Sequence, residues 1–458
     1  MRFARSMAFM AVLASTMTGC LGSSTNSRDT NNPLSAARGG VNPPSAQGGD
    51  CEGLPTAPES LRVDLDTPAF SNPLDAFNPL FPVGELDRVV LLGESDGEPF
   101  RTETTRLPGT RTIVIDGQPI ETIISQYVAW KDRRIAEVAL DWYGQDDEGN
   151  VWYFGEDVFN YEDGVVVDME GTWIAGDEFP VAMIMPAAPQ VGDVWRPENA
   201  CPIVFEEVTA LETNVTVIGP SGPVAGALLV KELHLDGLFE DKTFAPGYGE
   251  FSTGVAGSGN VEALAVAVPT DFIGGEVPED LDDLADGAER MFNLARRGGW
   301  RRIASLFEEM EEDWDDYEMT GVPPLVAEVM GDAMDALDEA IIARDRTAAR
   351  QAAVDIALAG LDFELLYEDR ADIDLDLIEV WTLQLQLDQA AHDRGGVRSD
   401  LETIRVIRDR LAPALANRVD LELSAIRSAT NAEDEGALMA SAAKLNEAIA
   451  ELTNRAAR

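Results

Sequence analysis

The sequence predicts an α+β chain of more than one domain, with an N-terminal antiparallel β meander, barrel-like or sandwich-like, followed by a C-terminal antiparallel helical bundle. Two patterns in the sequence predict this fold class. Residues 60–272 carry short apolar or alternating runs divided by turn residues, which are typical of strands. In residues 278–458 apolar side chains instead recur every three or four positions, as in amphipathic helices. A chain of 458 residues is also too long for one ordinary core.

Residues 1–19 have the features of a lipoprotein signal peptide. Two arginines precede the uncharged segment "SMAFMAVLAS", which is too short to span a membrane, and small residues precede Cys20. The Cys20 thiol is then the acylation nucleophile, and two or more acyl chains anchor a protein stably. We therefore expect the chain to contact a lipid membrane through Cys20. The alternative is a plain secretory signal in which Cys20 is incidental.

Residues 20–59 are rich in Ser, Asn, Gly and Pro and poor in large apolar side chains, so they predict a flexible tether. An exported protein anchored by lipid is expected, and because Leu21 is not Asp, the outer membrane or the cell surface is favoured if the cell is Gram-negative. Of three cysteines, Cys51 and Cys201 remain after Cys20. In an oxidising compartment they predict a disulfide, and the alternative is two unrelated buried thiols.

The strand region is expected to hold about ten to twelve strands joined by short turns. In "TRTIVIDGQPIETIISQYVAW", for example, Asp-Gly separates two β-branched runs, as in a hairpin. Connections this short favour pairing between strands that are neighbours in sequence.

The helical region begins after a cluster of glycines and prolines near residue 275, where we expect few contacts to cross. About six or seven helices are expected, joined by short loops that make successive helices antiparallel. One of them, over 398–420, contains Pro413 and should kink there. Asn431 is expected to cap the last helix.

Acidic residues outnumber basic ones by 83 to 34, which gives a formal net charge of −49. The excess is spread along the whole chain, which is typical of a surface adapted to a salty medium or kept soluble by self-repulsion. Nucleic acid is not expected as a partner, because its phosphates need clustered Lys and Arg.

Residues for catalysis or for a bound metal are few, and no cofactor is expected. His234 lies in a predicted strand and His392 at a predicted helix end, and neither has a second histidine at ligand spacing. Two groups of carboxylates have the hard oxygen ligands that calcium prefers, with solvated turn or helix-start carboxylates as the alternative; they are Asp372, Asp374 and Asp376, and Asp146, Asp147 and Glu148.

Aromatic residues are concentrated between positions 142 and 173. An inward aromatic face could hold an apolar ligand such as a lipid or a glycan ring, and the alternative is ordinary core packing. The residues of this possible ligand face are Trp142, Trp152, Phe154 and Trp173.

Four segments, "NPLFPVGELDRVVLLGESDGEPF", "DWYGQDDEGNVWYFGEDVFNYEDG", "MPAAPQVGDVWRPEN" and "KTFAPGYGEF", resemble a family of uncharacterised bacterial exported proteins and lipoproteins. The resemblance covers residues 70–254, and "DIDLDLIEVWTLQLQLDQAA" is similar to helical extensions of related exported proteins. It implies an extracytoplasmic β domain and assigns no functional residue.

Two functional classes remain open. The first is a membrane-anchored binding or structural module of the cell envelope, whose ligand or envelope partner is not defined by the sequence. The second is a carboxylate-dependent enzyme, such as a glycosidase-like hydrolase. The first is favoured, because nucleophile and histidine motifs of common enzymes are absent from the sequence.

Overall fold

The computed structural model describes residues 51, 53–254, 261–432 and 435–456. The expected signal peptide (1–19), Cys20 and the tether up to residue 50 lie outside these ranges. Within the described ranges, each helix is too short or too polar to cross a membrane.

Fourteen antiparallel strands form the first part of the chain that the structure describes. They are β1 (Arg88–Ser95), β2 (Glu98–Ile115), β3 (Gln118–Lys131), β4 (Arg134–Gln145), β5 (Val151–Glu162), β6 (Val165–Asp168), β7 (Trp173–Ile174), β8 (Ala182–Met185), β9 (Val194–Ala200), β10 (Val204–Gly219), β11 (Gly222–His234), β12 (Phe239–Ala245), β13 (Gly249–Gly254) and β14 (Val261–Val268).

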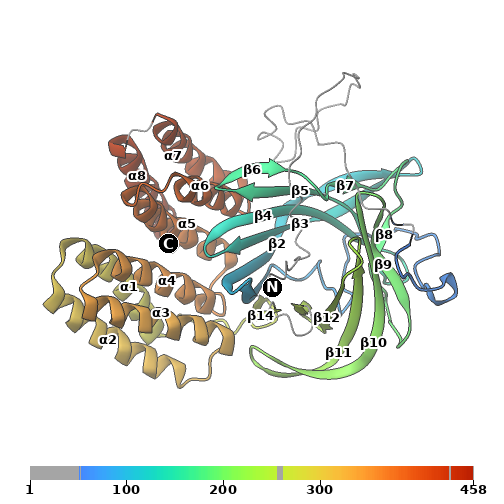
Figure 1. Cartoon of the computed structure of the whole chain (residues 1–458), viewed down its shortest axis with the longest axis horizontal. Coiled ribbons are helices and arrows are strands. Elements are labelled where there is room, and N and C mark those ends of the chain that lie inside the picture. The colour runs from blue at the N-terminus through green and yellow to red at the C-terminus, as the bar shows by residue number, and fades with distance from the viewer. Residues whose placement is uncertain (1–50, 52, 255–260, 433–434, 457–458) are drawn as a thin grey trace, which may run out of the picture.

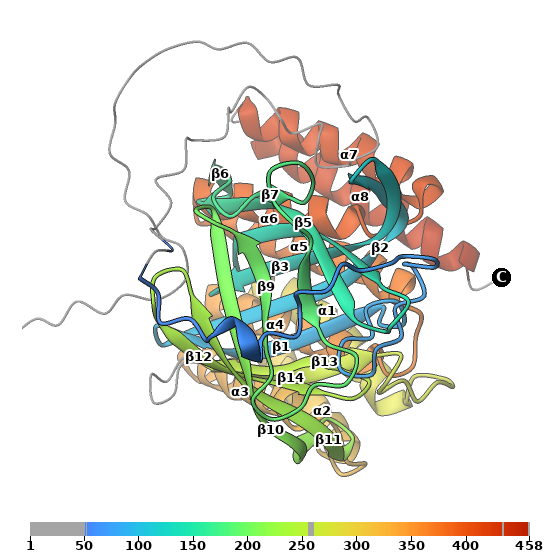
Figure 2. The ribbon, with the colours of Figure 1, turned by 90° about the vertical axis from the view of Figure 1, so that its right-hand side faces the viewer.

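One curved sheet holds all of these strands, as a meander in which β1 and β14 pair with each other. The order is β6-β5-β4-β3-β2-β1-β14-β13-β12-β11-β10-β9, and both β7 and β8 pair with β5. The sheet curls into a sandwich-like shape that is not closed, so one face is concave (Figures 1 and 2).

The predicted Asp-Gly hairpin turn is present between β2 and β3. Asp116 and Gly117 both have positive φ angles, 49° and 77°, as a two-residue turn that matches the strand twist requires. Ile115 pairs with Gln118 directly beside this turn, so the turn fixes the register of the two strands.

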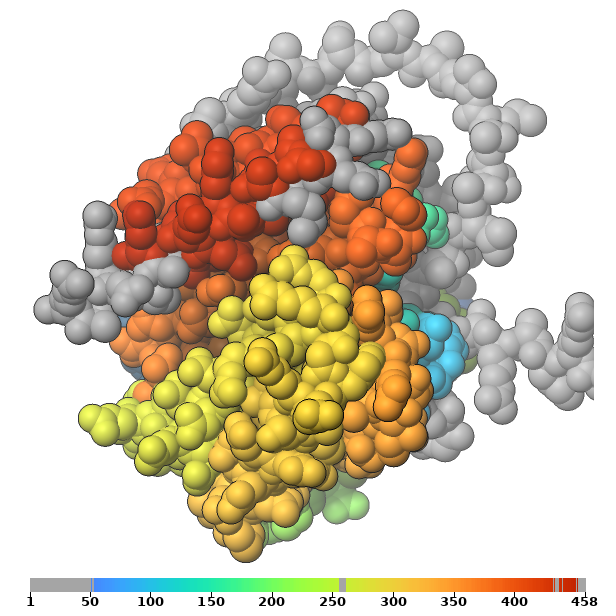
Figure 3. Space-filling view, turned by 90° about the vertical axis from the view of Figure 1, so that its left-hand side faces the viewer, coloured from blue at the N-terminus to red at the C-terminus, as the bar shows by residue number. Residues whose placement is uncertain are grey.

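In the described residues, eight α-helices follow the sheet, and a short 3-10 turn at Glu59–Leu61 precedes β1. They are α1 (Glu279–Arg297), α2 (Trp300–Glu318), α3 (Pro324–Ala343), α4 (Arg346–Glu364), α5 (Arg370–Ala390), α6 (Arg394–Arg408), α7 (Pro413–Asn431) and α8 (Glu435–Ala456). Together they cover the face of the molecule turned away from the sheet's open side (Figure 3).

The fold class is confirmed, with corrections in detail. Fourteen strands replace the expected ten to twelve, because short strands such as β7 carry little periodic signal. Eight helices replace six or seven, because Pro413 starts α7 instead of kinking a longer helix; a first-turn proline has no hydrogen bond to lose. Asn431 is the last residue of α7 and does not begin α8.

Side-chain contacts between the sheet and the helices cross the change of pattern near residue 275. The secondary structure does change between β14 and α1, but the buried apolar residues of sheet and helices form one continuous cluster. Trp130 of β3 stacks on Trp381 of α5 at 6.5 Å, and its indole nitrogen donates to Thr403 of α6 at 3.0 Å. Helix side chains therefore cover the apolar side chains on this face of the sheet.

Ion pairs also join the helices to the convex face of the sheet. Arg101 on β2 makes two hydrogen bonds of 2.7 Å to Asp362 on α4, and Arg410 lies 2.5 Å from Glu103. Arg88 pairs with Asp374, and both side chains are buried. Burial opposes ionisation of Glu103, but Arg410 and Arg101 outweigh it and hold the pKa of Glu103 well below its usual range.

The expected disulfide is present: Cys51 and Cys201 are bonded, with their Cα atoms 6.4 Å apart. It fixes the start of the described chain beside β9. The following segment stays on the sheet, since Arg62 bridges to Val194 and Phe70 packs 5.2 Å from the ring of Phe154.

Candidate functional site

The concave face of the sheet carries carboxylates from most of its strands. We call this set the carboxylate belt, together with its two basic residues, His234 and Lys242. Its acidic members are Glu137, Asp141, Glu156, Glu198, Glu206, Glu232, Glu240, Glu250 and Glu262.

Strand alternation and sheet curvature explain why these side chains meet. On β3, Gln126 and Trp130 contact the helices, so Tyr127 between them points to the opposite, concave face. There Tyr127 lies within electrostatic range of Glu250 on β13 and Lys242 on β12, strands that are four and five places away in the sheet. The curl of the sheet therefore brings distant strands face to face.

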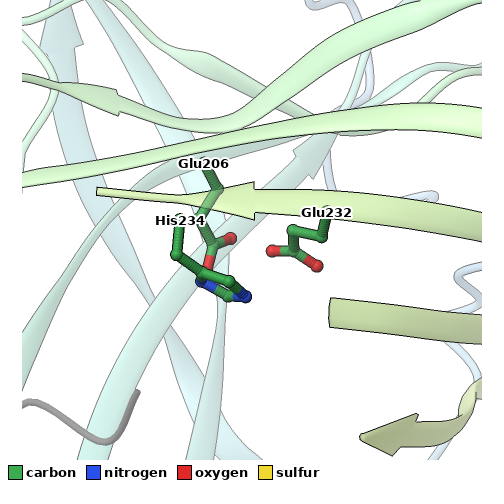
Figure 4. Close-up of side chains that lie close together, drawn as sticks. All are labelled: Glu206, Glu232 and His234. Atoms are coloured by element: carbon green, nitrogen blue, oxygen red, sulfur yellow. The ribbon is translucent and has the colours of Figure 1, made fainter. Parts of the chain in front are cut away.

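At the centre of the belt, Glu206, Glu232 and His234 come from the paired strands β10 and β11 (Figure 4). The imidazole of His234 has one nitrogen, Nδ1, 3.3 Å from Glu206 and the other, Nε2, 3.4 Å from Glu240. The Glu232 carboxylate, 2 % exposed, lies 3.0 Å from the Lys242 ammonium through one oxygen. Its other oxygen, Oε1, has no hydrogen-bond partner.

These contacts set opposite protonation states on neighbouring groups. Burial opposes the charge on His234, but Glu206 and Glu240 raise the pKa of His234 to about 11. Burial likewise opposes ionisation of Glu206, and His234 lowers the pKa of Glu206 in spite of it. For Glu232, burial and the adjacent Glu206 raise the pKa well above the ordinary value. The centre thus holds an ionised carboxylate, Glu206, beside a second one, Glu232, whose pKa is raised.

An imidazole held in this way is a poor metal ligand. A histidine binds a metal through a neutral ring nitrogen, whereas both nitrogens of His234 lie beside carboxylates, which favour the protonated imidazolium. The three side chains offer ligand atoms within 4.8 Å of one another. Their chemistry nevertheless favours an internal ion-pair network with Lys242 over a resident metal.

One end of the belt combines carboxylates with aromatic rings. The Tyr153 hydroxyl donates to Asp141 at 2.9 Å, and Asp141 lies opposite Glu156 on the next strand. Tyr153 stacks on Tyr143 with ring centroids 4.8 Å apart, and Trp173 meets Tyr153 edge-on at 5.4 Å. Buried acids therefore lie directly beside aromatic rings.

Carboxyl groups at this end tend to hold protons. Burial, with Glu137 nearby, raises the pKa of Asp141 to about 7, although the bond from Tyr153 opposes the shift. Burial and Asp141 raise the pKa of Glu156 well above the ordinary value, and burial and Glu206 do the same for Glu198. Few basic groups are present here to compensate negative charge.

The belt continues around the concave face to β14. The Glu262 carboxylate accepts a hydrogen bond from Thr102 at 3.0 Å, and burial with Glu250 nearby raises its pKa to about 7. Tyr127 lies within electrostatic range of both Glu262 and Glu137, the two ends of the series. Acidic groups thus surround the inner face.

The aromatic residues predicted as an apolar ligand face are buried among protein neighbours. Arg111 lies over the Trp142 ring at 3.6 Å, and the N-terminal segment covers Phe154 through Phe70. The indole of Trp152 donates to Asp146 at 2.8 Å. Of the four, only Trp173 packs against Tyr153 beside the belt, so the set does not form one surface.

The other predicted candidates have protein partners or lie apart from the belt. Asp146 accepts hydrogen bonds from its own turn, including the Asn150 amide, and Asp147 binds Ser71. Asp374 pairs with arginines, as described above. His392 follows the end of α5 with a φ angle of 57°.

Sequence reasoning missed the belt, although a signal for it exists. In "KELHLDG", Glu232 and His234 share one strand parity, and in "ALDWYGQ" so do Asp141 and Tyr143. Charged residues at alternate strand positions ordinarily face solvent, and only the curl of the sheet turns them inward.

In comparisons with known proteins, no family model and no curated protein matches this chain.

Proposed function

We propose that this chain is a membrane-anchored, extracytoplasmic binding protein whose concave sheet face binds an organic cation with one or more amino groups. The observation that carries the proposal is the carboxylate belt, in which nine acidic side chains face two basic ones, His234 and Lys242.

The charge balance of the belt favours a cation. Buried carboxylates without basic partners must hold protons or bind a cation, because the interior solvates a charge poorly. Burial raises the pKa of Asp141 and of Glu137 to about 7. An ammonium group placed between them would replace those protons with its own charge.

The aromatic rings favour an organic cation over a bare metal ion. Ammonium groups are attracted to the faces of Tyr and Trp rings, and Tyr143, Tyr153 and Trp173 lie beside Asp141 and Glu156. Carboxylates combined with aromatic faces recognise both the charge and the apolar stem of an amine.

The location outside the cytoplasm is supported by two features. A structural disulfide, Cys51–Cys201, persists in oxidising compartments. The signal-peptide pattern before Cys20 supplies the anchor, and Cys51, near the end of the polar segment, is joined to the sheet by its disulfide.

Calorimetric titration of the full chain, purified in detergent, with spermidine at low salt tests the proposal. We expect saturable binding, with a heat that differs between phosphate and Tris buffers because protons leave the belt. Glu156→Gln should weaken binding by about tenfold or more, the effect of losing one buried charge-assisted contact. Glu121→Gln on the exposed part of β3 removes the same charge and should bind as the wild type does. Equal affinity in both variants, or no saturable heat, would refute the proposal.

A second candidate function has one specific observation in its favour. Burial and Glu206 raise the pKa of Glu198, while Glu206 itself is held ionised by His234, and acids of opposite protonation state are the groups that glycosidases use. Turnover of an aryl glycoside that disappears in Glu206→Gln but persists in Glu121→Gln would favour an enzyme over a binding protein.

A further inference from the structure

The end of the belt where acids meet aromatic rings also holds two buried polar groups without a partner. The indole nitrogen Nε1 of Trp173 and the hydroxyl oxygen of Ser125 have no hydrogen-bond partner among the described residues. Both residues are almost fully buried, with exposed fractions of 2 % and 1 %. Buried polar groups are normally hydrogen-bonded, so two unpartnered ones in one place point to a ligand that completes them.

Strand pairing places both groups on the concave face, each beside an acid of the belt. Trp173 of β7 lies directly opposite Glu156 of β5, and Ser125 of β3 lies directly opposite Asp141 of β4. Residues directly opposite each other in an antiparallel pair share one face of the sheet, with Cβ atoms about 4.5 to 5.5 Å apart. The two unpartnered groups and the two acids therefore surround one place on the concave face.

A β-bulge in β5 makes this arrangement possible. The pairing of β4 with β5 shifts between Asp141 and Tyr143, because β5 has one extra residue there. The shift turns Tyr153 and Glu156 to the same face, although strict alternation would put them on opposite faces. Gly155 lies in the bulge with a φ angle of 119°, and a Cβ atom there would come within 2.4 Å of a carbonyl oxygen of β7. Glycine at this position therefore lets β7 approach β5.

The hydrogen-bonding chemistry of the two groups requires more than an ammonium group. An ammonium only donates, so it satisfies a carboxylate but not the Trp173 N–H, which also only donates. Trp173 needs an acceptor, and a hydroxyl group is both an acceptor and a donor. A ligand hydroxyl can therefore accept from Trp173, and a second one can bond with the Ser125 hydroxyl. An ammonium with hydroxyl groups close to it satisfies the acids and the unpartnered groups together.

The distribution of basic residues places the ammonium at this end of the belt. At the centre, Glu206 already lies beside His234 at 3.3 Å and Glu232 beside Lys242 at 3.0 Å. The groups that most affect the pKa of Asp141 are instead Tyr153 and another acid. A ligand cation therefore finds uncompensated acids beside Trp173 and not at the centre.

We propose that the ligand of the belt is an amino alcohol, the chemical unit that amino sugars carry. Its ammonium group binds Asp141 and Glu156, and its hydroxyl groups bind Trp173 Nε1 and the Ser125 hydroxyl. This inference rests on the proposed function, because the acids supply the cation site, and it narrows the ligand from amines in general to hydroxylated amines. A site that bonds a ligand hydroxyl discriminates against the analogue without it, which leaves the site's buried polar groups unpaired.

Calorimetric titration of the full chain in detergent with three matched compounds tests the inference. Glucosamine carries an ammonium and hydroxyl groups, cyclohexylamine carries an ammonium on a six-membered ring without hydroxyl groups, and glucose carries hydroxyl groups without an amine. We expect glucosamine to bind at least about tenfold more tightly than cyclohexylamine, since it makes two more buried hydrogen bonds. Glucose should show no saturable heat. Spermidine, titrated into the same samples, reports separately on the proposed function.

Two variants assign the preference to the unpartnered groups. Trp173→Phe keeps a ring against Tyr153 but removes the N–H, and Ser125→Ala removes the hydroxyl. Each should weaken glucosamine binding about fivefold to tenfold, the effect of one buried hydrogen bond, and leave cyclohexylamine binding unchanged. Trp300→Phe at the start of α2 removes an indole N–H in the helical region and should leave both affinities unchanged.

The outcomes separate this inference from the proposed function. If spermidine binds but glucosamine binds no more tightly than cyclohexylamine, the amino-alcohol inference is wrong and the cation site stands. The same conclusion follows if Trp173→Phe and Ser125→Ala weaken both ring amines equally. If no amine binds, both proposals are wrong. A folded Ser125→Ala protein decides the matter even if Trp173→Phe fails to fold.

Discussion

Buried carboxylates occur in two different settings in this molecule. On the convex face, Glu103 lies against Arg410 and Arg101 and stays ionised. On the concave face, Asp141 has a tyrosine hydroxyl and other acids as neighbours, so burial raises its pKa to about 7. The first setting joins helices to the sheet, whereas in the second burial and neighbouring acids make the carboxyl group keep its proton to a higher pH.

The raised pKa of Asp141 predicts that stability falls between pH 5 and pH 8. The unfolded chain loses this proton near pH 3.8, but the folded chain keeps it to about pH 7. Its contribution to the free energy of unfolding is therefore complete below pH 3.8 and is lost as the pH rises through 7. Glu137 and Glu262, whose pKa values burial also raises to about 7, act in the same direction.

Asp141→Asn tests this assignment, because the amide can still accept the hydrogen bond from Tyr153. We expect the fall in Tm from pH 5 to pH 8, followed by circular dichroism, to shrink by about 1 °C or more, since 1 °C corresponds to roughly 1 kcal/mol in a chain of this size. Glu121→Gln should leave the profile as it is. An unchanged profile in Asp141→Asn would mean that Asp141 titrates normally.

Cys20→Ser tests the predicted anchor. Without the thiol there is no acylation nucleophile, so we expect the variant to lose labelling by radioactive palmitate and to leave the membrane fraction. Cys51→Ser removes a cysteine without touching the lipid site and should still be labelled. Labelled, membrane-bound Cys20→Ser protein would show that the plain secretory alternative holds.

The sequence predicted the partner of a residue only where its chemistry leaves few possible partners. Export and the assignment of Cys20 to lipid left Cys51 and Cys201 as a pair, and the structure joins them. The same reasoning could not place Glu206 beside Glu232, because contacts across a sheet depend on register, which is set by bulges such as the one between Ala210 and Glu212.

At the scale of elements, the sequence was most informative where periodicity was long. Strands of twelve or more residues such as β3 and β4 were recognisable, whereas β7, with two residues, was not. Pro413 was interpreted as a kink because a proline at the first turn and a proline in the interior look alike in sequence. Only the break after α6 distinguishes them.

Packing of α5 on β3 predicts a large effect of Trp381→Ala. The ring stacks on Trp130 and is 6 % exposed, so truncation would leave a cavity between helix and sheet. We expect a loss of about 3 to 5 kcal/mol in the free energy of unfolding, measured with urea. Leu421→Ala on α7, where the side chain is 72 % exposed, should change it by less than about 0.5 kcal/mol. Similar small effects in both variants would show that the stack adds little stability.

For the whole molecule, the change from strands to helices is not a boundary between independent cores. Glycines and prolines near residue 275 correctly marked where the secondary structure changes, but they contain no information about packing. Strand residues such as Arg88, Arg101 and Trp130 carry that information, because their partners lie in the helices. The separations along the chain are 286, 261 and 273 positions. Pairings so distant in sequence leave no local pattern.

The last prediction follows from this shared core. Sheet and helices should unfold together, because separating them would expose buried ion pairs such as Arg88–Asp374 and the apolar surface around Trp130. We expect a single calorimetric transition for the full chain. Limited proteolysis should remove the tether first and then leave a resistant unit that spans the sheet and most of the helices. An isolated fragment of residues 60–276 should be insoluble or should bind a hydrophobic dye, since the helix-facing side of the sheet would be uncovered. Two separate transitions, or a fragment that melts cooperatively by itself, would show instead that the sheet is an independent domain.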